Sequence, residues 1–274
     1  MPASALFLAL AAAVLHAGWN VLIARARDVE AATAVAVALS VVFFAPFAAL
    51  TWDVDREAIP YIVAGGVLHL TYFALLAAAY RRADLGLVYP LSRGLAPALV
   101  LGVTAVALAD DPTRIEAVGV LIVVAGVLSV RGARRPADGR GTAFALVIPA
   151  CIAAYTLVDN EGVRHADPIP YLVLLMTGPA VVYATALALT RGARPLRREL
   201  GPSTALAAVA MFGAYILVLL ALQRAPAAPV AAVRETSVVI AAVLAVVVLR
   251  EPFSWPRIAG SAIVAVGISV LALG

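Results

Sequence analysis

Long runs of apolar residues, separated by short polar stretches, make up most of the chain. A helix that crosses a bilayer needs about 20 mainly apolar residues, and these runs are continuous instead of alternating with polar positions. A helix also satisfies its own backbone hydrogen bonds in lipid. The pattern therefore predicts ten membrane-spanning helices, at residues 3–24, 31–52, 59–80, 85–109, 115–130, 142–158, 169–190, 203–223, 226–249 and 256–273.

The composition leaves no room for a soluble domain. Of the 274 residues, 64% are apolar and 13% are charged, whereas a soluble protein is about 45–50% apolar and about 25% charged. We expect one all-α integral membrane bundle, and we set aside the disordered, collagen-like, disulfide-scaffold and nucleic-acid-binding classes. The first run has no basic segment before it and continues through His16 and Trp19 to Arg25, which favours a mature helix over a signal peptide.

All 20 basic residues are arginines, and they are unevenly divided between the connections. The odd-numbered connections carry fourteen of them: Arg25, Arg27, Arg81, Arg82, Arg131, Arg134, Arg135, Arg140, Arg191, Arg194, Arg197, Arg198, Arg250 and Arg257. The even-numbered connections carry four: Arg56, Arg114, Arg164 and Arg224. The positive-inside rule places the arginine-rich side in the cytoplasm. We therefore expect a multi-pass protein of the cell inner (cytoplasmic) membrane with both termini outside.

The chain contains an internal repeat, in which residues 89–130 align with residues 230–271. The aligned pairs are Arg93 with Arg234, Gly119 with Gly260, Gly126 with Gly267 and, after a one-residue shift, Asp111-Pro112 with Glu251-Pro252. We expect a first five-helix repeat at residues 1–130, a connecting loop at 131–141 and a second five-helix repeat at 142–274. Because five is odd, the repeats enter the membrane from opposite sides. Secondary transporters use such inverted repeats to hold a substrate near the membrane midplane.

These features resemble a known family. The five-plus-five plan, the proline-containing fourth and ninth helices, the two acid-proline steps and the Trp19-Asn20 pair in the first helix are similar to the EamA-type transporters of the drug/metabolite transporter superfamily. The resemblance covers nearly the whole chain. It implies a ten-helix basket that moves small organic metabolites, often outward.

Arg93 and Arg234 are the most informative polar residues, because each lies about eight residues, or about 12 Å, inside a predicted span. A charge at the bilayer centre costs at least about 2.5–3.5 kcal/mol on the insertion scale, so it is rarely kept without a role. Two interpretations stay open. The two guanidiniums face a central cavity and bind a carboxylate or phosphate. Alternatively they are structural, and either snorkel toward the membrane face or pair with an acid, such as Arg93 with Glu235 across the halves. Glu235 is the only acid clearly inside a predicted span, and in a regular helix it points about 100° away from Arg234.

Other polar side chains share helix faces at i, i+3 and i+4 spacing. The sets are Tyr89, Ser92 and Arg93; His16, Trp19 and Asn20; and His69 with Tyr72. Tyr155 aligns with Trp19 in the repeat. The predicted solute-binding residues are Arg93, Arg234, Tyr89, Ser92, Trp19, Asn20, Tyr72 and Tyr155. The candidates for proton coupling are His16, His69 and Glu235.

The sequence thus favours a secondary transporter, an exporter of amino acids or other anionic or zwitterionic solutes that works by alternating access. No ATP-binding motif is present, so a gradient must supply the energy. The lone Cys151 excludes an intrachain disulfide and a cysteine metal cluster, and we expect no cofactor, metal or nucleic acid. The expected partners are a small-molecule solute and the lipid bilayer, with a homo-oligomer left open. Two alternatives remain: a membrane-embedded lipid-modifying enzyme, although no HExxH or GxSxG motif occurs, and a non-transporting membrane scaffold.

Overall fold

The computed structural model describes residues 1–82, 85–107, 112–130, 139–249 and 255–273. In these residues the chain is almost entirely helical, with one isolated backbone bridge between Val54 and Ala166. The helices are α1 (Ala3–Ala24), α2 (Val29–Leu50), the 3₁₀-helix η1 (Arg56–Ala58), α3 (Ile59–Arg82), α4 (Leu85–Ala107), α5 (Arg114–Val130), α6 (Gly139–Gly162), α7 (Pro168–Arg191), α8 (Ala193–Glu199), α9 (Pro202–Leu222), α10 (Ala227–Arg234), α11 (Thr236–Leu249) and α12 (Trp255–Leu273).

The apolar runs of the sequence become helices, and eight of the ten predicted spans begin and end within two residues of one. Three details differ. The sixth predicted span, 142–158, is longer at both ends in α6; the ninth, 226–249, is divided between α10 and α11; and α8 lies in a predicted loop. Helices long and apolar enough to cross a membrane occur in the described residues at Ala3–Ala24, Val29–Leu50, Arg56–Leu76, Pro168–Arg191 and Pro202–Leu222, with shorter apolar stretches at Arg93–Val106 and Ile258–Leu273.

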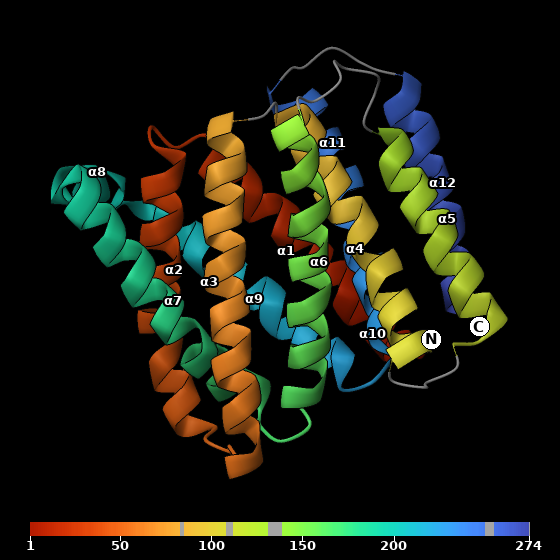
Figure 1. Cartoon of the computed structure of the whole chain (residues 1–274), viewed down its shortest axis with the longest axis horizontal. Coiled ribbons are helices and arrows are strands. Elements are labelled where there is room, and N and C mark those ends of the chain that lie inside the picture. The colour runs from red at the N-terminus through yellow and green to blue at the C-terminus, as the bar shows by residue number, and fades with distance from the viewer. Residues whose placement is uncertain (83–84, 108–111, 131–138, 250–254, 274) are drawn as a thin grey trace.

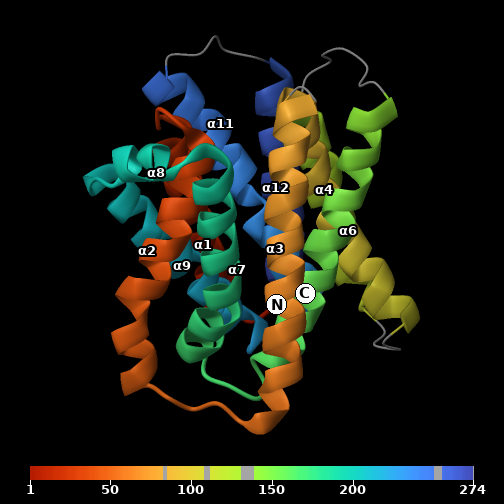
Figure 2. The same ribbon diagram turned by 60° about the vertical axis from the view of Figure 1, so that its left-hand side comes forward.

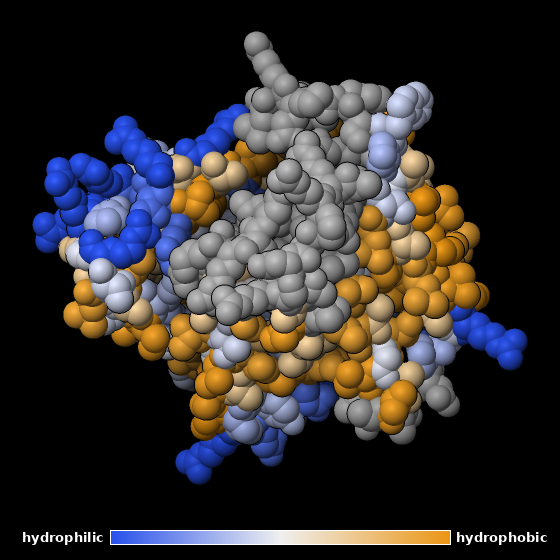
Figure 3. All heavy atoms as spheres, turned by 45° about the horizontal axis from the view of Figure 1, so that its top comes forward, coloured by the Kyte–Doolittle hydropathy of each residue, from blue (hydrophilic) through white to orange (hydrophobic). Residues whose placement is uncertain are grey.

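The flank of the bundle is suited to lipid. Large apolar side chains are strongly exposed there, including Phe7, Leu50, Val106, Leu189 and Leu273. Figure 3 shows hydrophobic side chains over much of the visible flank, and hydrophilic side chains gathered beside α8 and at the opposite end of the bundle. Such a surface would be costly in water and is favourable in a bilayer.

Local sequence signals explain several helix ends. The Asp28 side chain accepts a hydrogen bond from the Ala31 amide at 3.1 Å and so caps the start of α2. Proline begins α7 at Pro168 and α9 at Pro202, where the missing amide hydrogen costs nothing. Gly192, with φ of 79°, ends α7 and turns the chain into α8.

The aligned glycines bring α5 and α12 into close contact. A Cβ added at Gly126 would lie 2.7 Å from the Val264 amide nitrogen and 2.9 Å from the Gly260 carbonyl. One added at Gly267 would lie 2.8 Å from the Val123 nitrogen and 3.0 Å from the Gly119 carbonyl. Residues near the start of α5 contact residues near the end of α12, and later residues of α5 contact earlier residues of α12. The two helices therefore run antiparallel (Figure 1). The small glycines thus allow the two helix backbones to pack closely.

The largest contacts between helices are reproduced when the first half (α1–α5) and the second half (α6–α12) are exchanged. Helix α1 packs on α9 as α6 packs on α3, α2 packs on α9 as α7 packs on α3, and α4 packs on α6 as α10 and α11 pack on α1. Helices α2 and α7 pack against each other, as do α5 and α12.

Both termini lie at one end of the bundle (Figure 1), where the Met1 ammonium donates to the Leu271 carbonyl at 3.1 Å. Figure 2 shows α8, which lies in the connection between α7 and α9, toward the other end of the bundle. The two halves therefore enclose a common interior.

Candidate functional site

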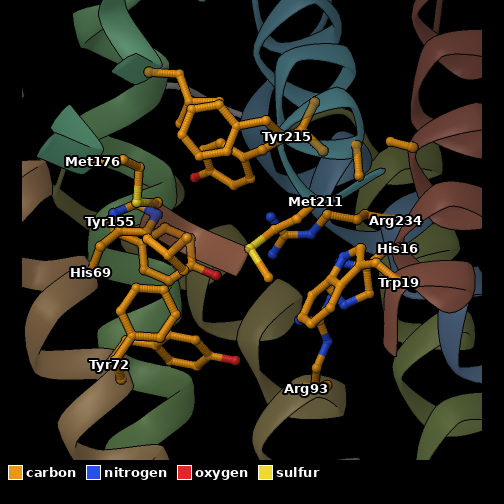
Figure 4. A pocket seen from close by; sticks show the side chains of 17 residues that line it. His16, Trp19, His69, Tyr72, Arg93, Tyr155, Met176, Met211, Tyr215 and Arg234 are labelled. Carbon is orange, nitrogen blue, oxygen red and sulfur yellow. The ribbon is translucent and has the colours of Figure 1, made fainter. Parts of the chain in front are cut away.

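A cavity of about 80 Å³ lies between the two halves. Helices α1 to α4 line it from the first half, and α6, α7, α9 and α10 from the second. Its lining residues that were singled out in the sequence are His16, Trp19, His69, Tyr72, Arg93, Tyr155 and Arg234. In Figure 4, Arg93, Arg234, His16 and Trp19 lie on one side, opposite His69, Tyr72 and Tyr155. The cavity thus has a cationic side and an aromatic side.

The cationic side contains a buried cluster of three charges. The Arg93 Nε donates to Glu235 Oε2 at 3.0 Å, and Arg234 Nε lies 3.8 Å from Glu235 Oε1. Arg93 and Arg234 are each 3% exposed and Glu235 is fully buried. The predicted pair of Arg93 with Glu235 across the halves is therefore present, and both arginines also line the cavity. One carboxylate between two guanidiniums leaves a net positive charge.

A break in the predicted ninth helix creates this cluster. α10 ends at Arg234 and α11 begins at Thr236. Between them the Glu235 amide donates to the Ala232 carbonyl at 3.1 Å, and the Val238 amide donates to the Glu235 carbonyl at 2.9 Å. These i to i+3 bonds form a 3₁₀ turn, which is wound more tightly than an α-helix. The angle of about 100° expected between Arg234 and Glu235 applies to one continuous α-helix, and at this turn the two side chains approach to 3.8 Å without a hydrogen bond.

Arg234 has hydrogen-bonding capacity that the described residues do not use. Its Nε and Nη2 atoms are buried and have no hydrogen-bond partner in the described part of the chain, and the same holds for Glu235 Oε1. Buried polar groups without partners are rare in folded proteins and cost about 1–3 kcal/mol each, more when they are charged. A guanidinium in this state at a cavity wall is suited to bind a planar anion through two parallel N–H groups.

The opposite side of the cavity is built from rings. The His69 ring lies 4.2 Å from that of Tyr155, and Tyr72 lies 5.9 Å from Tyr155. A side-chain hydrogen bond also joins Tyr72 to Arg93. On the cationic side the His16 and Trp19 rings meet edge to face at 4.9 Å. These rings give apolar walls to a cavity that carries charge on one side.

Two of the predicted site residues, Asn20 and Glu235, do not line the cavity. Asn20 turns back along α1, where its Nδ2 donates to the His16 carbonyl at 2.7 Å. Glu235 lies behind the two arginines that it contacts. Tyr89 and Ser92 fall on α4, but their side chains lie outside the described residues.

Asp159 is the residue that the sequence interpretation missed. Its side chain is fully buried, and it accepts hydrogen bonds from the Tyr171 hydroxyl at 2.9 Å and from the Tyr215 hydroxyl. His69 Nε2 lies 3.9 Å from Asp159 Oδ2. The predicted sixth span stopped at residue 158, one residue short, whereas α6 continues to Gly162. Asp159 is therefore a second acid buried inside the helical bundle, in addition to Glu235, which the sequence had singled out.

The described residues contain no group of three or more His, Cys, Asp or Glu side chains that could hold a metal ion. Cys151 is buried and its thiol contacts the Leu68 carbonyl at 3.3 Å. The side chains that line the cavity offer charge, hydrogen bonding and aromatic contact.

The comparisons with known proteins agree with this arrangement. The sequence model of the EamA-like transporter family matches residues 3–132 and 139–273, once in each half. The chain belongs to the EamA-like transporter family. As in the rest of this family, the chain is a multi-pass membrane protein built from two repeats, and the resemblance found in the sequence is confirmed.

Solved structures share the fold at low sequence identity. One crystal structure matches with a TM-score of 0.77 and 16% identity, and the match covers 100% of this chain and 98% of that chain. No curated protein sequence matches the chain. The family and the fold are thus established, while the solute has to be inferred from the cavity.

Proposed function

We propose that the protein is a secondary transporter that moves a small organic solute with an anionic or zwitterionic group across the cell inner membrane. The observation that carries this proposal is Arg234, a buried guanidinium at the cavity between the halves with two nitrogen atoms that have no hydrogen-bond partner in the described residues. Ten segments cross the membrane in this proposal, with α10 and α11 together forming the ninth. Amino acids and other small carboxylates have the charge and size that such a site favours, and export is the direction that we propose.

The charge of the cavity supports an anionic solute group. Two arginines and one glutamate lie together, so a carboxylate entering beside Arg234 would balance the cluster. The solute's remaining atoms would contact Tyr72, Tyr155 and Trp19. This division between a charged side and an aromatic side favours a solute with a charged head and an apolar body over a simple inorganic ion.

The size of the cavity supports alternating access. At about 80 Å³ it is smaller than the about 150 Å³ of an engineered protein cavity that accepts benzene. A solute of amino-acid size therefore enters only after the halves move apart on one side. A cavity at the interface of two antiparallel halves also favours a transporter over a scaffold, because a scaffold needs no polar interior.

A ligand screen with matched variants tests the proposal. The purified protein is heated with individual L-amino acids, small carboxylates and phosphate esters, because a ligand bound only to the native state raises the melting temperature. We expect at least one carboxylate to stabilise the wild type and Arg224→Gln, whose arginine is exposed and contacts only the Leu220 carbonyl in the described residues. Arg234→Gln should lose about 10- to 100-fold in affinity, the cost of one charge-assisted hydrogen bond.

The same solute should then enter proteoliposomes that contain wild type or Arg224→Gln, and not those with Arg234→Gln. Uptake that survives Arg234→Gln at the wild-type rate would contradict the anion site. A screen in which no small solute stabilises the wild type, together with no uptake of any solute tested, would contradict the transporter itself.

A further inference from the structure

Asp159 is a buried acid that the proposed solute site does not use. It lies on α6, and the groups that surround it come from the helices packed around it. The titratable and charged side chains around Asp159 are His69 of α3, Tyr171 of α7, Tyr215 of α9 and Arg234 of α10. The adjoining cavity is also lined by His16 of α1, Tyr72 of α3, Arg93 of α4 and Tyr155 of α6. Of the groups around Asp159, His69 and Tyr215 both contact it and line the cavity. His69 and Tyr215 thus lie between Asp159 and the cavity proposed to bind the solute.

The two tyrosines show how this carboxylate is held. Each of its oxygens accepts one hydroxyl hydrogen bond, from Tyr171 to Oδ1 and from Tyr215 to Oδ2. An ionised carboxylate only accepts hydrogen bonds, whereas a protonated one must also donate. A proton on Oδ2 adds a donor that needs an acceptor of its own, and it weakens the hydrogen bond that Oδ2 accepts from the Tyr215 hydroxyl. Because Tyr215 belongs to the cavity wall, the protonation state of Asp159 changes that wall.

His69 offers a route between the cavity and Asp159. Its Nδ1 lies 2.9 Å from the Gly65 carbonyl, and since a carbonyl can only accept, Nδ1 carries the hydrogen in the neutral ring. Nε2 is then free to accept a proton, and it faces Asp159 Oδ2 at 3.9 Å. This gap is too long for a hydrogen bond, so transfer needs a small side-chain movement or one bridging water molecule.

Glu235, the acid that the sequence favoured for proton coupling, is less suited to the task. It is the counter-ion of Arg93 and contacts Arg234 as well. Binding a proton there would leave two buried guanidiniums without a negative partner. Asp159 makes an ion-pair contact only with His69 within the described residues, so its proton can come and go without stranding an arginine.

We propose that Asp159, reached from the cavity through His69, binds and releases one proton in each transport cycle. This inference rests on the proposed function, because it requires a cycle. The proton comes from water, bonds to His69 Nε2 and gives an imidazolium. It then passes to Asp159 Oδ2, which restores the neutral ring and gives a carboxylic acid. Release to water on the other side reforms the carboxylate and its two tyrosine hydrogen bonds.

Infrared difference spectroscopy on the purified protein tests proton binding without any solute. The protein is compared in weakly alkaline and weakly acidic buffer, a range in which exposed carboxylates stay ionised. We expect a protonated-carboxyl band to appear on acidification in the wild type and in Asp167→Asn, whose side chain is exposed and makes no cap hydrogen bond. The band should be absent in Asp159→Asn. A band that persists in Asp159→Asn overturns the proposal.

If Asp159→Asn does not fold, Tyr215→Phe takes its place in the same measurement. Removing one donor to the carboxylate weakens its ionised form, so the band should then appear at a higher pH than in the wild type. An unchanged titration overturns the proposal.

Transport separates this inference from the proposed function. A mixture of radiolabelled L-amino acids is offered to proteoliposomes, once as exchange without a pH gradient and once as net uptake driven by a pH gradient. Asp159→Asn should keep exchange and lose at least tenfold of the gradient-driven uptake, while Asp167→Asn keeps both. Exchange by the wild type without any effect of the gradient, or full gradient-driven uptake by Asp159→Asn, overturns the proton site alone. A wild type that neither exchanges nor accumulates contradicts the transporter.

Discussion

At the scale of single residues, the two aligned arginines occupy equivalent positions and have different surroundings. Glu235 follows Arg234 in the second half, and its aligned position in the first half is Gly94, which packs against Val127 and Leu128. One carboxylate therefore serves both guanidiniums, and Arg93 holds it more closely than Arg234 does. The two halves differ at this position, because the second half has a glutamate where the first half has a glycine. That glutamate is the counter-ion of both arginines.

Glu235→Gln should destabilise the protein strongly. It leaves two buried arginines beside each other without a negative partner, a loss of about 3–5 kcal/mol when one partner of a buried charge pair is removed. The double variant Glu235→Gln with Arg93→Gln restores the net charge of the cluster and should recover part of the stability. Thermal unfolding in detergent measures both. A single variant that melts at the wild-type temperature would contradict the assignment of Glu235 as the common counter-ion.

Tyr171→Phe tests the hydrogen bond that supports Asp159. Tyr171 is fully buried and its hydroxyl donates to Oδ1, and a hydrogen bond to a charged acceptor contributes about 1.5–3 kcal/mol. We expect the melting temperature to fall by about 3–12 °C, at about 2–4 °C per kcal/mol for a large domain. Tyr61→Phe, at a partly exposed ring stacked on His165, should melt like the wild type. Equal melting of the two variants would show that the Tyr171 hydroxyl contributes no net stability.

At the scale of helices, two local features decide how the halves meet. The glycines of α5 and α12 allow their backbones to approach within the space that a Cβ would occupy. The 3₁₀ turn at Glu235 lets α10 and α11 present an arginine and a glutamate to the same interior. The first feature fixes the antiparallel contact of the halves, and the second places charge at it.

Gly126→Ala should separate α5 from α12, because the new Cβ meets backbone atoms that cannot turn away. We expect a loss of about 1–3 kcal/mol, the usual cost of overpacking, and a similar loss for Gly267→Ala at the equivalent position. Gly102→Ala is the control: nothing lies within 4 Å of its added Cβ, so alanine should be neutral or stabilise α4 by up to about 1 kcal/mol. Thermal melting of the three variants ranks them, and equal stability of all three would contradict the close contact.

At the scale of the whole molecule, the two ends of the bundle join the halves in different ways. At the end where α8 lies, Arg191 of α7 pairs with Asp28 and with Glu30 at the start of α2. At the other end the α2–η1 and α6–α7 connections form backbone hydrogen bonds, with Asp167 donating to Asp53 at 2.8 Å and Asp55 to His165 at 2.9 Å. An opening of the cavity toward one end would therefore loosen a different set of bonds than an opening toward the other.

The arginine distribution predicts which end faces the cytoplasm. In a Cys151→Ser background, Glu57→Cys on the arginine-poor end should react with a membrane-impermeant maleimide in intact cells. Arg194→Cys on the arginine-rich end should react only after the cells are permeabilised. Both positions are exposed in the structure, so accessibility depends on the side of the membrane. The reverse labelling pattern would place the termini in the cytoplasm and contradict the orientation that we expect.

The sequence alone determined the helices, the repeat and the family resemblance. Burial of apolar surface in lipid depends on local composition, so each span can be identified without knowledge of its neighbours. The sequence also singled out His16, Trp19, His69, Tyr72, Tyr155 and the two arginines, all of which line one cavity. A polar residue in an apolar run can be recognised because placing it in the membrane costs free energy, whichever helix it packs against in the folded protein.

Only the tertiary structure decided which of these residues meet. The contact of Arg93 with Glu235 joins α4 to the break between α10 and α11, and that break arises from a change of helical winding that apolar periodicity does not reveal. Asp159 lies near the end of its helix, where the sequence is also compatible with an exposed loop residue. It is buried because α3, α7 and α9 bring His69, Tyr171 and Tyr215 around it. Burial near a helix end depends on the surrounding helices, and those are placed only when the two halves pack together.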